Sequence, residues 1–126
     1  MSTACLLVGT AVLTLASQDF ELRWRHSVER IEWRESWAVD GGRLHLTEAA
    51  VKGSGAGMEP GEGARLMKGW WVWRPDLAPV SVLTLAASGA TGQGWRLCDA
   101  VTCREIGAEP GAPIALRPCG GADVEP

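Results

Sequence analysis

"DFELRWRHSVERIEWRESWAV", residues 19–39, is the stretch that decides the fold. Its first half alternates between an apolar face (Phe20, Leu22, Trp24, His26, Val28) and a polar face (Glu21, Arg23, Arg25, Ser27, Glu29). A period of two is typical of a half-buried antiparallel strand. The alternation changes phase at residues 30–31 and resumes with Trp33, Trp37 and Val39. This change predicts a tight turn or a bulge, with a second strand after it.

The chain on either side of this stretch contains more short β patterns separated by glycine and proline. We expect a turn at residues 40–42, a strand with Leu44 and Leu46 inward, a Trp-rich strand in "GWWVWRPD", and further strands on both sides of "SGATGQG". No segment has a helical period. The pattern predicts an all-β protein, either an antiparallel β-sandwich or a partly open barrel.

The two ends of the chain differ in composition from the middle. The apolar run at residues 4–16 predicts two strands, roughly 4–8 and 11–16, with a turn at Gly9. It lacks a positively charged leader and is too short to span a membrane as a helix, but the remnant of an export signal is the alternative interpretation. Residues 107–126 are rich in proline and glycine. We therefore predict one β domain over residues 1–106 and a flexible, disordered tail over 107–126.

Size and charge limit the classes of function. A chain of 126 residues forms one domain with a real core. The net charge is −3, and the four Arg and four Glu of residues 21–37 are interleaved. A nucleic-acid partner is therefore excluded, because its usual basic footprint is missing, and the charged residues are interpreted as a solvated strand face.

Four cysteines are compatible with disulfides in an exported protein. Cys98 and Cys103 flank a predicted hairpin tip, so we predict a cross-hairpin disulfide between them. A single C-x4-C pair is a poor match to zinc spacing. Cys5 and Cys119 could be partners, but no sequence signal pairs them.

The chain has seven Trp, one Phe and no Tyr. Trp as the preferred large core residue is one interpretation. A stacking surface for a ligand, or a belt at a membrane interface, is the other.

The stretch "KGSGAGMEPGEG", residues 52–63, has the glycine content of a phosphate-binding loop. It lacks the spacing of a dinucleotide fingerprint and the Gly-Lys-Ser/Thr ending of a P-loop, and Glu59 and Glu62 would repel a phosphate. Two interpretations remain. The backbone amides form a nest for an anionic or carbonyl-bearing ligand, or the loop passes closely between two sheets.

The polar candidates give no clear catalytic pattern. His26 is either a buried, hydrogen-bonded histidine or a ligand-binding one. Ser27 lies on the opposite strand face, so the two adjacent residues make an awkward nucleophile–base pair, and Ser54 reaches His26 only through the fold. Glu29, Glu32, Glu35 and Glu48 form no evident acid–base pair. His26 and His45 are too isolated for a metal site, and nothing in the sequence indicates a cofactor.

Three segments together resemble a bacterial family, domain of unknown function 1850. They are "HSVE" at residues 26–29, "GSGAGMEP" at 53–60 and the Trp-rich strand with Trp70, Trp71 and Trp73, and the resemblance spans about residues 5–106. Members tend to be encoded beside, or fused to, membrane subunits of TAXI-type TRAP transporters. The resemblance therefore implies a non-enzymatic, periplasmic or otherwise extracytoplasmic accessory domain for solute uptake, held at the membrane by transporter or solute-binding subunits. It implies no catalytic activity.

The matched strand and loop are expected to form a common pocket for a ligand or a partner. Its expected residues are His26, Ser27, Glu29, Gly53, Ser54, Gly55, Gly57 and Met58. The alternatives are a small-ligand or carbohydrate-binding module, a hydrolase using His26 and Ser54, and an adhesion-type protein with exposed Trp.

Overall fold

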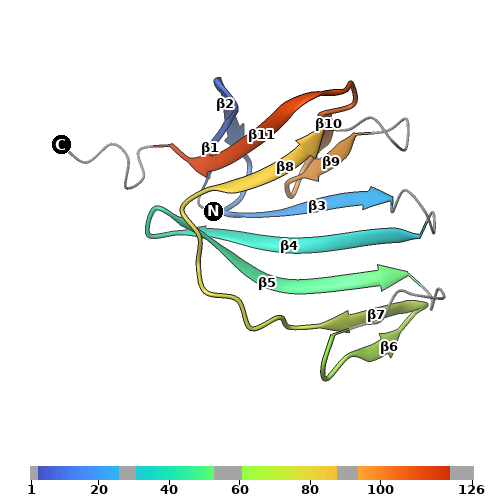
Figure 1. Ribbon diagram of the computed structural model, residues 1–126. Coiled ribbons are helices and arrows are strands. Elements are labelled where there is room, and N and C mark those ends of the chain that lie inside the picture. The colour runs from blue at the N-terminus through green and yellow to red at the C-terminus, as the bar shows by residue number, and fades with distance from the viewer. Residues whose placement is uncertain (1–2, 26–30, 53–60, 88–93, 120–126) are drawn as a thin grey trace.

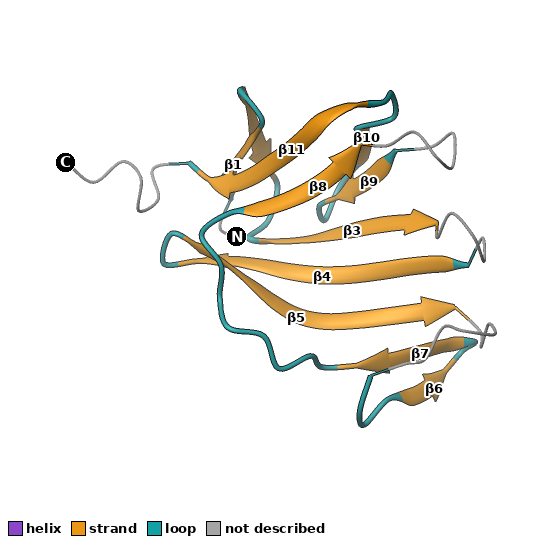
Figure 2. Cartoon of the chain, in the orientation of Figure 1, coloured by secondary structure: helices purple, strands orange, loops and turns teal. Residues whose placement is uncertain are grey.

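The computed structural model of the chain describes residues 3–25, 31–52, 61–87 and 94–119. These residues form strands joined by turns and loops, as Figure 2 shows. Within this part of the chain, no helix is long and apolar enough to cross a membrane. Every secondary-structure element among these residues is a strand, so the predicted all-β class is confirmed.

Two antiparallel sheets pack face to face as an open sandwich (Figure 1). The smaller sheet has the order β2-β1-β11-β8. Its strands are β1 (Ala4–Val8), β2 (Ala11–Leu15), β8 (Leu83–Ala87) and β11 (Gly111–Pro118). The larger sheet has the order β10-β9-β3-β4-β5-β7-β6. Its strands are β3 (Asp19–Arg25), β4 (Glu32–Asp40), β5 (Arg43–Lys52), β6 (Arg65–Met67), β7 (Trp70–Trp73), β9 (Trp95–Cys98) and β10 (Cys103–Ile106).

The alternation in residues 19–39 sets the two faces of the larger sheet. Phe20 pairs with Trp37 across β3 and β4, and both side chains are buried, as is Leu22. Glu21 and Arg23 point to the opposite, outer face because successive strand side chains alternate. The hairpin from β4 to β5 turns at Gly41 and Gly42, which both have positive φ and so confirm the predicted turn.

The core lies between the smaller sheet and the β9-β3-β4 region of the larger one. Its buried side chains are Leu6, Leu15, Phe20, Leu22, Trp37, Leu44, Leu85, Leu97 and Leu116. The indole of Trp95 also joins the sheets, because its Nε1 donates to the carbonyl of Ala86 at 2.8 Å. The β5-β7-β6 half of the larger sheet contributes few residues to this cluster.

The N-terminal strands form as predicted, and Gly9 has the positive φ of the expected turn. The flexible tail predicted for residues 107–126 is wrong over β11. This strand pairs with both β1 and β8, and Leu116 is fully buried. Composition misled because Pro113 lies within the irregular stretch between Gly111 and Ile114, where a ladder tolerates proline. Residues 120–126 lie outside the described residues.

Two disulfides close the fold. The predicted bond between Cys98 and Cys103 joins β9 to β10, where the two residues are register partners. Cys5 and Cys119, which the sequence left unpaired, form the second bond and link β1 to the residue after β11. The Cys119 amide also donates to the Cys5 carbonyl at 3.0 Å, so this bond continues the β1–β11 ladder.

A single carboxylate holds the β9–β10 hairpin against the start of β3. Asp99 accepts hydrogen bonds from the backbone amides of Ala16, Thr102 and Val101 at 2.9, 2.8 and 2.8 Å. These bonds to Ala16, then Thr102 and Val101, lower the pKa of Asp99 to about 2. The hairpin tip is thus fixed to the β2–β3 junction at neutral pH.

We predict that the two disulfides contribute unequally to stability. Cys5–Cys119 has a sequence separation of 114, against 5 for Cys98–Cys103. Loop-closure entropy in the unfolded chain then gives about 5 kcal/mol for the first bond and about 2 kcal/mol for the second. Urea unfolding of the Cys5→Ser/Cys119→Ser and Cys98→Ser/Cys103→Ser variants measures both losses. Equal losses would contradict this assignment.

Candidate functional site

The pocket expected from the sequence lies outside the described residues. This holds for every residue named for it: His26, Ser27, Glu29, Gly53, Ser54, Gly55, Gly57 and Met58. Its described neighbours are Arg25, opposite Glu32, and Lys52, opposite Trp70. Both neighbours lie at the same end of the larger sheet, separated by β4 (Figure 1). The common pocket stays a prediction.

Two glycines of the 52–63 stretch, Gly61 and Gly63, lie in the described structure, and Gly63 has a positive φ. A Cβ atom at Gly61 would overlap the indole ring of Trp73. Here the missing side chain permits close approach of the backbone to a β7 tryptophan. At this position the glycine serves packing rather than a ligand nest.

We predict that Gly61→Ala destabilises the protein by roughly 1–3 kcal/mol, because the rigid indole of Trp73 must move to accept the methyl group. Gly111→Ala is the matched control, since a Cβ at Gly111 meets no atom within 4 Å. Thermal unfolding of both variants measures the difference. A Gly61→Ala variant as stable as the control would show that the approach to Trp73 is not a constraint.

The inner face of the larger sheet carries a line of tryptophans, here called the tryptophan row: Trp95, Trp24, Trp33 and Trp71. Trp24 pairs with Trp33, and the buried Val51 separates Trp33 from Trp71. The ring centroids of Trp24 lie 4.7 Å from Trp95 and 5.9 Å from Trp33. This contact chain favours the core interpretation of the tryptophans, because the rings pack on one another.

A carboxylate, Glu35, interrupts the inner face beside the tryptophan row. Its neighbours across the sheet are Leu22 and Ala49, and its Oε1 accepts a hydrogen bond from Trp37 Nε1 at 3.0 Å. Burial raises the pKa of Glu35 above 4.5, and the bond from Trp37 partly opposes this. Nearby, the buried Trp33 Nε1 has no hydrogen-bond partner among the residues that the structure describes. The inner face therefore holds two polar groups in surroundings that disfavour them.

We predict that Glu35→Gln stabilises the protein at neutral pH. A raised pKa means that the folded state binds the proton more tightly, so the contribution of Glu35 to stability is greatest below pH 4.5 and is lost as pH rises through the folded pKa. Glutamine keeps an oxygen for the Trp37 bond but carries no charge. Urea unfolding from about pH 4 to 8 should show a gain over the parent that grows with pH. A pH-independent difference would contradict this account.

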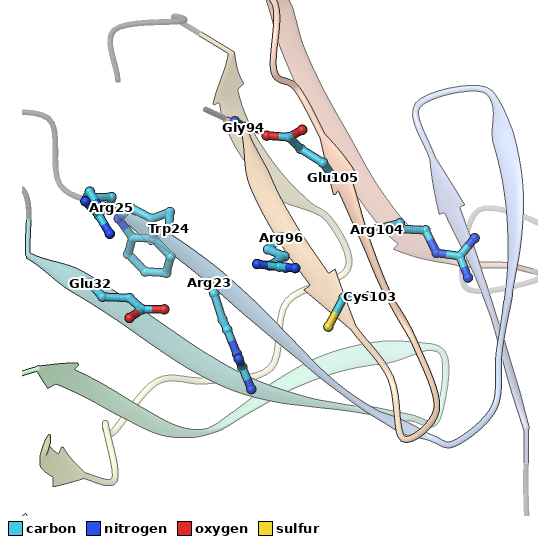
Figure 3. A pocket seen from close by; sticks show the side chains of 9 residues that line it. All are labelled: Arg23, Trp24, Arg25, Glu32, Gly94, Arg96, Cys103, Arg104 and Glu105. Carbon is cyan, nitrogen blue, oxygen red and sulfur yellow. Dashed lines mark hydrogen bonds between the residues drawn. The ribbon is translucent and has the colours of Figure 1, made fainter. Parts of the chain in front are cut away.

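The outer face of the larger sheet carries a charged basin of about 390 Å³ (Figure 3). It is lined by Arg23, Trp24, Arg25, Glu32, Gly94, Arg96, Cys103, Arg104 and Glu105. Figure 3 shows Arg104 directed away from the other arginines. A broader depression of about 1040 Å³ shares Arg23, Arg96 and Cys103 with the basin. The outer face is thus hollowed where β9 meets β3.

Three arginines lie in direct register across this face. Arg96 of β9 pairs with Arg23 of β3, and Arg23 pairs with Arg34 of β4. We call these residues the arginine row. Directly opposite residues on neighbouring strands have Cβ atoms about 4.5–5.5 Å apart, and like charges in that position destabilise a sheet. The arginine row therefore places like charges side by side on the outer face.

Partners inside the protein take up only part of this charge. Glu21 binds Arg23, with its Oε1 2.8 Å from Nη2 and 3.0 Å from Nε. Arg34 lies over the ring of Trp70, 4.4 Å from the centroid, and Lys52 lies 5.7 Å from the same ring. Arg96 is exposed. Guanidinium groups in such an arrangement suit carboxylate or phosphate groups, which they bind with paired hydrogen bonds.

No sequence signal indicates the arginine row, because it joins distant segments. The predicted polar strand face with Arg23 and Arg25 is confirmed. The pairing of β3 with β9 brings in Arg96 from more than seventy positions away. Among the described residues, no group of three or more His, Cys, Asp or Glu side chains is placed to hold a metal ion.

These features define a class: a small, disulfide-bonded, open β-sandwich with a cationic hollow on one face and tryptophans on the other. The chain belongs to the family described as Domain of unknown function (DUF1850), whose model matches residues 20–106. The match confirms the family indicated by the sequence and covers all of the larger sheet except its first residue, Asp19. No curated protein and no solved structure gives a significant match to the chain.

Proposed function

We propose that the protein is a non-enzymatic binding domain that acts outside the cytoplasm as an accessory part of a TAXI-type TRAP uptake system. The observation that carries the binding role is the arginine row. Its guanidinium groups lie on an open sheet face, where an anionic group can pair with them without any chemical step. Such a surface holds a partner or a ligand rather than transforming it.

The disulfides support the proposed compartment. All four cysteines of the chain are paired, and one bond joins residues near opposite ends of the described chain. Disulfides of this structural kind persist in oxidising compartments such as the periplasm and are rare in a reducing cytosol. An extracytoplasmic domain would keep both bonds.

The link to TRAP transport comes from the family. The resemblance implies proximity to TAXI-type membrane subunits, and an accessory domain needs a surface that binds such a subunit or the solute-binding protein. The outer face supplies exposed charge over several strands. Charge complementarity of this kind favours specific, rapid association between proteins.

The test is co-purification. The disulfide-bonded protein, expressed with an affinity tag in the periplasm, should retain the membrane or solute-binding subunits of a co-expressed TAXI-type system from the same organism. A tagged periplasmic β protein of similar size and charge is the control. Absence of both subunits from the eluate would overturn the TRAP link.

A carbohydrate-binding module is the second candidate, and the tryptophan row is the observation that favours it. Trp24 and Trp33 pack on one another but are only half-buried, so part of each indole stays accessible for an apolar contact with a sugar ring. Failure to retain a subunit in the co-purification, together with a higher thermal unfolding temperature in the presence of neutral sugars, would favour this alternative.

A further inference from the structure

Arg34 and Lys52 lie on the outer face beyond the basin and continue its row of cations as a band. We propose that this band (Arg96, Arg23, Arg34, Lys52 and Trp70) is the docking surface for an extended, carboxylate-rich segment of a partner protein. The inference rests on the proposed function, since it assigns the chemistry of the partner that an accessory domain would bind. It names the contact surface without depending on which subunit supplies the segment.

The band carries an electrostatic cost. Three guanidinium groups follow one another on β9, β3 and β4 in direct register, and within the described part of the chain only Arg23 is ion-paired, with Glu21. Like charges placed opposite each other weaken the sheet. Carboxylates brought by a partner would remove that repulsion and gain charge-assisted hydrogen bonds at the same time.

The band extends over five strands of the larger sheet. It begins on β9 with Arg96 and ends on β7 with Trp70, crossing β3, β4 and β5 in between. Four spacings between neighbouring strands amount to about 19 Å. A single small anion fills only part of that distance. A segment of about six extended residues covers all of it.

An aromatic side chain, Trp70, forms one end of the band. Arg34 and Lys52 both lie over Trp70, within 4.4 and 5.7 Å of its ring centroid. Both cations therefore lie close to the indole on the outer face. Trp and Arg are the residue types most enriched among the energetic centres of protein interfaces. A partner segment gains an apolar contact here in addition to ion pairs.

Acidic residues around the band make a polyphosphate a poor occupant. Glu32 and Glu105 line the basin, and Glu105 lies opposite Arg96. Glu105 also accepts a hydrogen bond from the Gly94 amide at 2.9 Å, which holds it in place. A protein segment can space its carboxylates to meet the arginines and avoid these two glutamates. A uniformly charged chain cannot.

The experiment uses a peptide of about ten residues in which Glu alternates with Ser, titrated into the full-length ¹⁵N-labelled protein. We expect the Nε–Hε signals of Arg96, Arg23 and Arg34 to shift. The affinity should fall steeply between about 0.02 M and 0.15 M salt, because exposed ion pairs are screened. Absence of binding at low salt would overturn the proposal.

Two double variants with the same change in net charge separate the band from general attraction. Arg34→Gln/Arg96→Gln should weaken peptide binding by about fivefold or more. Arg43→Gln/Arg74→Gln alters two exposed arginines outside the band and should stay within about twofold of the parent. Thermal unfolding confirms that each variant is folded. Equal weakening in the two variants would overturn the proposal.

Two further measurements test whether a small carboxylate or a second copy of the chain occupies the band instead. Citrate that binds as tightly as the peptide and shifts the same arginine signals would indicate a small-carboxylate site and overturn the extended docking surface. Self-association lost only in Arg34→Gln/Arg96→Gln, seen by sedimentation, would assign the band to a second copy of the chain and overturn it as well.

The two proposals can fail separately. Subunits retained equally by Arg34→Gln/Arg96→Gln and by the parent would leave the accessory role standing and overturn the docking band. Peptide binding through the band, without retention of any TRAP subunit, would support the docking band and overturn the TRAP link.

Discussion

The antiparallel pairing of β3 with β4 on one side and β9 on the other is the constraint on which the rest of the structure depends. Side chains in a strand alternate between faces, so a slip of one residue would exchange the two faces of the strand. In the observed register, Phe20 and Leu22 enter the core while Glu21 and Arg23 stay outside. The same register aligns the tryptophans on one face and the arginines on the other.

The smaller sheet packs on the inner face of the larger sheet and stabilises that register. Leu6, Leu85 and Leu116 pack on Leu22 and Leu97, which buries the centre of the larger sheet. The Cys5–Cys119 bond and Asp99 act at the margins of this core, the first on the β1–β11 ladder and the second at the β2–β3 junction. A small sandwich with unclosed sheets gains from such cross-links, because its edges have fewer neighbours than its centre.

The two faces of the larger sheet differ in what their side chains do: the inner face packs, and the outer face presents charge. In the tryptophan row, Trp24 packs on Trp95 and Trp33, and Trp33 also meets Trp73 edge to face, so these contacts serve cohesion. The arginine row contributes nothing comparable to the core, and its repulsion works against the sheet. Residues that oppose stability on an exposed face are better explained by binding than by folding.

Local sequence patterns predict the strand class, the alternation of β3, the Gly41–Gly42 turn, the Cys98–Cys103 bond and the family. Those features depend on neighbours a few positions apart, where period and turn chemistry are readable. The place of β11, the Cys5–Cys119 bond and the alignment of Arg96 with Arg23 and Arg34 were decided only by the tertiary structure. Each joins segments far apart in the chain, and local patterns do not specify which strands become neighbours.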